Sequence, residues 1–232
     1  MRKLVLFDID GTLVLTGGAG IRAMNRAGRD VLGTDALLDG VPIAGRTDWI
    51  ILHDAVAKLG RGLDEDLFAR LRDAYVRHLQ EEIEAPGQGA KGIMPGIEAL
   101  LPVLRSRPDV ILGLLTGNFE RGARIKLEHF DLWRYFTCGA FGDDAADRNA
   151  LVPFAVARAR DCGLGDVPYE DVIVIGDTPH DVACAEAVGA LPVAVATGTY
   201  TTAQLRETGA EIVLEDLSDT AGFLRLLEEP GR

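Results

Sequence analysis

Residues 3–12 read Lys-Leu-Val-Leu-Phe-Asp-Ile-Asp-Gly-Thr, and the architecture of the chain can be inferred outward from these ten residues. The apolar run at residues 3–7 predicts a short buried strand, and the acidic and glycine residues after it predict a turn. Similar apolar runs follow at residues 110–115, 172–175, 191–196 and 212–214. Because these runs alternate with helical segments, we expect a parallel sheet covered by helices on both faces. The predicted class is α/β, with a Rossmann-like three-layer core.

One stretch interrupts this alternation. Residues 17–84 hold three amphipathic helical patterns and no convincing strand, and each pattern places apolar side chains on one helical face. The glycine-rich segment 86–92 predicts a flexible return to the sheet. We therefore expect an all-helical cap subdomain at residues 16–86, inserted into a core domain made of residues 1–15 and 87–232.

Composition excludes several classes of protein. The 232 residues include 24 Lys and Arg and 36 Asp and Glu, a formal net charge of −12 that disfavours binding to nucleic acid or anionic lipid. No apolar run approaches the ~20 residues that span a bilayer, and the first carboxylates come too early for a signal peptide. Three cysteines without CxxC spacing are typical of reduced thiols. We expect a cytoplasmic protein without a nucleic-acid or membrane partner.

Polar residues follow three of the predicted strands. Asp8 and Asp10 follow the first strand, Thr116-Gly117-Asn118 follows the second, and Asp177 and Asp181 follow the strand at residues 172–175. The carboxyl ends of parallel strands meet at one edge of a sheet, where ligands bind. Converging carboxylates repel one another unless a cation lies between them, and Mg²⁺ prefers such oxygen ligands. No His or Cys cluster competes for a metal, so zinc is not expected.

These three motifs resemble, in order and spacing, motifs one, two and four of the haloacid dehalogenase superfamily, with a helical cap between the first two. Residues 175–181 and 194–200 look most like its phosphoglycolate-phosphatase-like branch. The resemblance covers nearly the whole chain. It implies an enzyme: a Mg²⁺-dependent phosphatase that hydrolyses a small phosphorylated, phosphoglycolate-like metabolite through an aspartyl-phosphate intermediate.

The resemblance also implies a role for each acid. Asp8 is the expected nucleophile, and Asp10 is the expected general acid and base that protonates the leaving oxygen and then activates water. Asp8, the backbone carbonyl of Asp10 and the carboxylate of Asp177 are the expected Mg²⁺ ligands. Two positions apart on a strand, the first two carboxylates share a face, but the bend after Asp8 is expected to aim them differently.

Four further residues carry expected supporting roles. Thr116 and the backbone amides of Gly117 and Asn118 are expected to bind the phosphoryl oxygens. Asp181 is expected to orient a metal-bound water or the basic residue of the third motif. An alternative for Asp181 is helix capping, because residues 178–181 match the sequence of a capping box.

The third motif departs from the family, which usually has a lysine there. The chain has four lysines, none in the required window: Lys3, Lys58, Lys91 and Lys126. Arg148 precedes the helical pattern at residues 151–160 and is our candidate for the catalytic and phosphate-binding cation, although arginine and lysine are not interchangeable. The alternative is a surface arginine paired with Asp147 or Asp144.

The cap is expected to contact the substrate through residues 45–48, Gly-Arg-Thr-Asp, between its first two helices. Arg46 is a candidate to bind a carboxylate or second anionic group, with Thr47 beside it. The alternative is structural, since Thr47 or Asp48 would serve as the N-cap of the following helix.

Other functions stay open or are disfavoured. A β-phosphoglucomutase-type phosphosugar isomerase shares the same core and cap, and a non-catalytic phosphometabolite-binding protein would keep the fold. A true 2-haloacid dehalogenase lacks the second acid of the first motif, which is present here as Asp10. A phosphonatase needs a cap lysine for a Schiff base, and the cap's Lys58 lies within a helical pattern.

Overall fold

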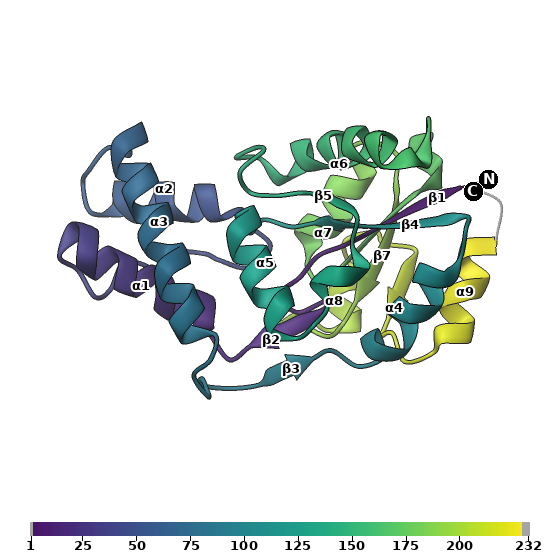
Figure 1. Cartoon of the computed structure of the whole chain (residues 1–232), viewed down its shortest axis with the longest axis horizontal. Coiled ribbons are helices and arrows are strands. Elements are labelled where there is room, and N and C mark those ends of the chain that lie inside the picture. The colour runs from purple at the N-terminus through teal and green to yellow at the C-terminus, as the bar shows by residue number, and fades with distance from the viewer. Residues whose placement is uncertain (1, 229–232) are drawn as a thin grey trace.

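A computed structural model describes residues 2–228, without the side chain of Leu164. A six-stranded parallel sheet forms the centre of the molecule (Figure 1). The strand order is β5-β4-β1-β6-β7-β8, so the first strand of the chain lies in the interior of the sheet. The strands are β1 (Lys3–Phe7), β4 (Val110–Leu115), β5 (Cys138–Ala140), β6 (Val172–Gly176), β7 (Leu191–Val195) and β8 (Ile212–Leu214). The predicted α/β class is confirmed.

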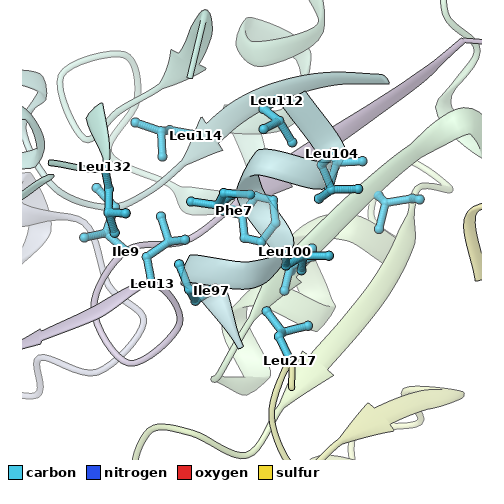
Figure 2. Close-up of a cluster of buried hydrophobic side chains, with 14 of the residues drawn as sticks. Phe7, Ile9, Leu13, Ile97, Leu100, Leu104, Leu112, Leu114, Leu132 and Leu217 are labelled. Carbon is cyan, nitrogen blue, oxygen red and sulfur yellow. The ribbon is translucent and has the colours of Figure 1, made fainter. Parts of the chain in front are cut away.

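Helices cover both faces of this sheet, and β1 shows how the sequence directs them. Val5 and Phe7 point into one apolar cluster, whereas Leu4 and Leu6 point into another on the opposite face. Figure 2 shows the first cluster, in which Phe7 lies beside Leu100 and Leu104 of α4. Its helices are α4 (Ile97–Ser106), α5 (Glu120–His129) and α9 (Thr220–Glu228), and the opposite face carries α6 (Leu151–Ala159) and α7 (Pro179–Glu186). A short helix, α8 (Thr202–Arg206), packs with β7 and α7.

Three helices, α1 (Ala19–Leu32), α2 (Asp48–Lys58) and α3 (Glu65–Glu82), lie together to one side of the sheet (Figure 1). They enclose a separate apolar cluster that includes Leu52, Leu71 and Leu79. Side-chain caps begin α2 and α3. The Thr47 hydroxyl accepts a hydrogen bond from the N–H of Ile50 in α2, and the Asp64 carboxylate accepts one from the N–H of Leu67 in α3. The three predicted helical patterns are confirmed. None of the helices within residues 2–228 is both long enough and apolar enough to cross a bilayer.

A short antiparallel ribbon joins the helical insertion to the sheet. It pairs β2 (Val14–Thr16) with β3 (Lys91–Ile93), so Thr16 lies opposite Lys91. The segment expected to be a flexible return, residues 86–92, therefore ends as a strand, because its backbone finds a partner just after β1. The strand β2 crosses the first expected domain boundary, between residues 15 and 16, whereas β3 begins four residues after the second boundary, at residue 87. The division at residues 16 and 87 stays a prediction.

Candidate active site

The polar strand ends converge on one edge of the sheet, as parallel pairing requires. Asp8 follows β1, Thr116 follows β4 on one side of it, and Asp177 follows β6 on the other. All three side chains are buried, with Asp8 5% exposed. The structure thus brings Asp8 and Asp177, which lie 169 positions apart in the chain, into one buried cluster.

Arg148 lies at the centre of this cluster. Its guanidinium Nη2 is 3.3 Å from Asp8 Oδ1 and donates to Asp181 Oδ1. The side chain is buried, and its Nε has no hydrogen-bond partner among the described residues. Of the two interpretations of Arg148, the surface arginine is therefore wrong: Asp144 instead binds Arg158, and Asp147 accepts the N–H of Asn149.

Asp181 combines both roles that its sequence context allows. Its Oδ2 accepts from the backbone N–H and the hydroxyl of Thr178, at 3.0 and 2.7 Å, which completes the capping box of α7. Its other oxygen, Oδ1, accepts from Arg148. The cap of α7 therefore fixes the carboxylate that in turn holds the arginine.

Asp177 lies across from these groups, against the turn after β1. Its Oδ1 accepts from the Thr12 hydroxyl at 3.3 Å. Gly11 of this turn has φ +84°, and a Cβ built there would lie 2.5 Å from the Asp177 carboxylate, so only glycine permits this approach. The first motif therefore requires a glycine at position 11, because Asp177 of the fourth motif packs against it.

Three of these acids form a set that fits a divalent cation. Oxygens of Asp8, Asp177 and Asp181 lie within 4.8 Å of one another, and all three side chains are buried. Burial raises the pKa of Asp8 to about 6, against the opposing effect of Arg148. Burial, reinforced by Asp181 and Asp8, raises the pKa of Asp177 to about 8. Hard oxygen donors that repel one another are the ligands that Mg²⁺ binds. The predicted ligands Asp8 and Asp177 belong to this set, and Asp181 joins them.

Asp10 faces a different cation from Asp8, in keeping with the expected bend. Its Oδ2 accepts from Lys126 Nζ at 2.6 Å and from Asn118 Nδ2 at 2.8 Å. Lys126 also donates to Asn118 Oδ1 at 2.6 Å, and Asn118 Nδ2 lies 2.8 Å from the Thr116 hydroxyl. The second motif and Lys126 together therefore hold the carboxyl group of Asp10.

The loop that begins α2 packs directly on the second motif. The backbone N–H of Asp48 donates to Gly117 O at 2.7 Å, and Asp48 Oδ2 accepts the N–H of Phe119 at 2.9 Å. A Cβ on Gly117 would lie 2.9 Å from the Thr47 Cα, so glycine is required for this approach. Burial raises the pKa of Asp48 to about 7, although Lys126 opposes the shift. Thr47 is the N-cap of α2 and also donates to Ala146 O at 2.7 Å.

A cavity of about 400 Å³ lies between the helical insertion and the strand ends. Its lining includes the site residues Asp8, Asp10, Thr116, Gly117, Asn118, Arg148 and Asp177, together with Arg46. Arg46 does not extend freely into this space. Its guanidinium donates to Asp54 Oδ2 at 2.7 Å and to Pro42 O at 3.1 Å. The expected role of Arg46 and Thr47 in substrate binding stays a prediction.

Comparison with known proteins identifies the family. Residues 5–186 match the family described as haloacid dehalogenase-like hydrolase. The chain belongs to the haloacid dehalogenase-like hydrolases. It is 33% identical over 232 residues to a protein named phosphoglycolate phosphatase from Rhodospirillum rubrum, covering 96% of this chain and 92% of that one.

Solved structures share the fold of this haloacid dehalogenase-like hydrolase. A predicted phosphoglycolate phosphatase from Haemophilus somnus has a TM-score of 0.70 at 19% identity, over 96% of this chain and 98% of that one. A putative beta-phosphoglucomutase from Thermotoga maritima has a TM-score of 0.59 at 23% identity, over 98% of this chain and 100% of that one. At these identities the likeness concerns the architecture. The family match and the relative at 33% identity show that the chain is an enzyme of the hydrolase family, as its motifs predict.

Lys126 is the site residue that sequence reasoning missed in this hydrolase. It lies outside the window of the third motif, yet its ammonium group reaches Asp10, 116 positions earlier in the chain. One signal was available. In α5 the buried residues are Gly122, Ala123, Lys126 and Leu127, so a lysine lies on the apolar face of the helix. A lysine there is buried only with a partner.

Proposed function

We propose that this hydrolase is a Mg²⁺-dependent phosphatase that hydrolyses a small phosphomonoester through an aspartyl-phosphate at Asp8. The observation that carries the proposal is the buried set of Asp8, Asp177 and Asp181 with Arg148 among them, at the carboxyl ends of β1 and β6. The relatives named phosphoglycolate phosphatase support the class of reaction. Cytoplasmic location belongs to the same proposal.

Asp8 and Asp177 would hold the Mg²⁺ ion, together with the carbonyl of Asp10. Asp181, whose two oxygens accept from Thr178 and Arg148, would hold the arginine in place beside them. The bound ion would supply charge neutralisation between an attacking carboxylate and a phosphate dianion. Arg148 would bind a phosphoryl oxygen, and its Nε is a buried donor without a partner among the described residues. Thr116 and the amides of Gly117 and Asn118 would bind the remaining phosphoryl oxygens.

The first half-reaction joins an Asp8 oxygen to phosphorus while the bond from phosphorus to the ester oxygen breaks. Asp10 gives its proton to the departing alkoxide, so the alcohol leaves neutral. In the second half-reaction Asp10 takes a proton from water, the water oxygen bonds to phosphorus, and the bond to Asp8 breaks. Inorganic phosphate leaves, and both acids return to their starting states. Lys126 and Asn118 position the Asp10 carboxyl group throughout.

The direct test is phosphate release from a panel of phosphomonoesters by the wild type and Asp8→Asn, each with Mg²⁺ and with EDTA. The neutral amide is a poor nucleophile, so we expect a loss on the order of 10⁴-fold or more. Asp66→Asn, whose side chain on α3 is exposed, is the matched control and should leave the rate unchanged.

Each other outcome changes a specific part of the proposal. Release that survives in Asp8→Asn would exclude Asp8 as the nucleophile, and release that is unaffected by EDTA would exclude the metal. No release, with interconversion of sugar phosphates, would indicate the phosphosugar isomerase. Binding of esters without turnover would indicate the phosphometabolite-binding protein.

A further inference from the structure

The wall of the cavity that faces the phosphate site is mostly apolar. Five side chains of the helical insertion contribute to it: Ile21, Met24, Leu38, Ile43 and Ile51. Ile21 is 45% exposed although it is a large apolar residue. An exposed apolar side chain at a cavity wall gains free energy when an apolar ligand covers it. The polar side chains that the insertion adds to this wall include Arg46, Asp48 and Tyr75.

The cations that line the cavity already have carboxylate partners. Arg148 is paired with Asp8 and Asp181, Lys126 with Asp10, and Arg46 with Asp54. Among the described lining residues, these three are the only lysines and arginines. A substrate carboxylate would therefore have to compete with a carboxylate of the protein for its cation, in a cavity that the buried carboxyl group of Asp48 also lines.

Two of the threonine hydroxyls on the sheet side are also engaged. Thr178 donates to Asp181 at 2.7 Å, and Thr197 donates to the carbonyl of Gly11 at 2.5 Å. A sugar presents several hydroxyls that each need a partner when they leave water. Both hydroxyls already donate a hydrogen bond within the protein, so they cannot donate one to a hydroxyl of a polyol.

We infer that the phosphomonoester hydrolysed here carries an uncharged and largely apolar alcohol, in place of a carboxylate-bearing one such as glycolate. The inference rests on the proposed phosphatase function and specifies its substrate class. The cavity of about 400 Å³ sets the size. That volume is within the range of about 300–1,000 Å³ found for sites that bind small molecules.

Three esters with similar alkoxide leaving groups test this inference. Isobutyl phosphate and 2-phosphoglycolate have the same number of non-hydrogen atoms and differ in whether the end of the alcohol is apolar or charged. Hexyl phosphate extends the apolar chain. We expect kcat/KM with Mg²⁺ to be about tenfold or more higher for isobutyl phosphate than for 2-phosphoglycolate, and higher again by about tenfold for hexyl phosphate.

A charge added to the wall should reverse this order. In Ile21→Lys a cation replaces an exposed apolar side chain of the wall, and we expect the ratio of isobutyl phosphate to 2-phosphoglycolate to fall by about tenfold or more. Leu59→Lys is the matched control, because Leu59 is an exposed apolar residue next to α2 that is not among the lining residues. It should leave the ratio unchanged.

The outcomes separate the inference from the function on which it rests. If 2-phosphoglycolate is hydrolysed as fast as isobutyl phosphate or faster, the apolar substrate class is wrong while the phosphatase stands. If glucose 6-phosphate exceeds hexyl phosphate, the alcohol is a polyol and the inference is again wrong. If none of the esters releases phosphate, the proposed function fails and the inference fails with it.

Discussion

Arg148 and Lys126 line the cavity at the strand ends, and the structure holds these two cations in different ways. Arg148 lies between Asp8 and Asp181, and all three side chains are almost completely buried. Lys126 is equally buried, but the Asp10 side chain that it binds is 43% exposed. The arginine therefore balances charges that water cannot reach, whereas the lysine binds an acid that water still solvates.

Because the acids bound by the two cations differ in exposure, the two cations are expected to contribute differently to stability and to turnover. A buried carboxylate that loses its only cation is left with an uncompensated charge, which destabilises the folded state. An acid that remains in contact with water loses little stability when its cation is removed, yet its position for proton transfer changes. Arg148 is therefore expected to matter for folding and for turnover, and Lys126 mainly for turnover.

Removal of Arg148 is expected to have the largest effect. Arg148→Met keeps the side-chain length but leaves Asp8 and Asp181 unpaired in the interior, so we expect a loss of about 3–5 kcal/mol in the free energy of unfolding. We also expect phosphate release to fall by at least about 10²-fold, because a phosphoryl oxygen loses its cation. Urea unfolding and initial rates measure the two effects.

The matched control for Arg148 is Arg158→Met. Arg158 also binds an aspartate, Asp144, but its side chain is 41% exposed, so the expected loss of stability is below about 1 kcal/mol. Equal losses in the two variants would show that burial does not distinguish the Arg148 cluster.

The pH dependence of stability tests the state of Asp48, a buried acid whose pKa Lys126 acts to lower. Its pKa is raised to about 7 by burial, above the value of about 3.9 for an unfolded aspartate. The folded state therefore holds a proton that the unfolded chain releases, and the contribution of Asp48 to the free energy of unfolding falls as pH rises from about 4 to about 7. Asp48→Asn removes this titration and can still accept the N–H of Phe119. Its stability relative to the wild type should increase by about 2–3 kcal/mol from pH 5 to pH 8.

Urea unfolding of both proteins at the two pH values gives this difference. Asp66→Asn is the control, because its side chain is 83% exposed and its difference from the wild type should not change with pH. A difference for Asp48→Asn that is the same at pH 5 and pH 8 would mean that Asp48 is ionised over the whole range.

Removal of Lys126 should reduce the rate without reducing stability. In Lys126→Met the side chain stays on the buried face of α5 while Asp10 and Asn118 lose the ammonium group. We expect kcat to fall about 10–100-fold with KM nearly unchanged, because the role proposed for Asp10 is proton transfer and not ground-state binding. The free energy of unfolding should stay within about 1 kcal/mol of the wild type, since an apolar residue replaces a buried charge.

Lys58→Met provides the comparison for this variant, since Lys58 lies on α2 and is exposed. It should change neither kcat nor stability by a measurable amount. A fall in the stability of Lys126→Met as large as that of Arg148→Met would remove the distinction between the two cations.

The sequence predicted the sheet better than it predicted the site. The apolar runs at residues 3–7, 110–115 and 212–214 became strands with those same bounds, because a continuous apolar run in a covered parallel sheet ends where polar residues begin. The ribbon of β2 and β3 was not predicted, since three-residue strands have no periodicity to detect and form only where a partner lies beside them.

Within the site, local context predicted Arg148 and not Lys126. Arg148 precedes a helix that follows a strand, and this position was visible in the chain. Lys126 reaches the site because α5 turns one face toward the first motif, and that contact depends on how helices pack over β1 and β4. The burial pattern along α5 indicates that this lysine has a partner, but it does not indicate which acid the lysine binds.

Arg46 carries the smallest expected effect and completes the comparison as a third cation at the cavity. Its partner Asp54 is 40% exposed, and pairs of this kind contribute about 0–1 kcal/mol. Since Arg46 is already bound to Asp54, Arg46→Ala should change kcat/KM by less than about threefold for 2-phosphoglycolate and for isobutyl phosphate alike. Asp54→Ala releases the arginine and is the informative counterpart. If Arg46→Ala reduces turnover of 2-phosphoglycolate alone, the arginine leaves Asp54 to bind the substrate carboxylate, and the apolar wall does not decide specificity.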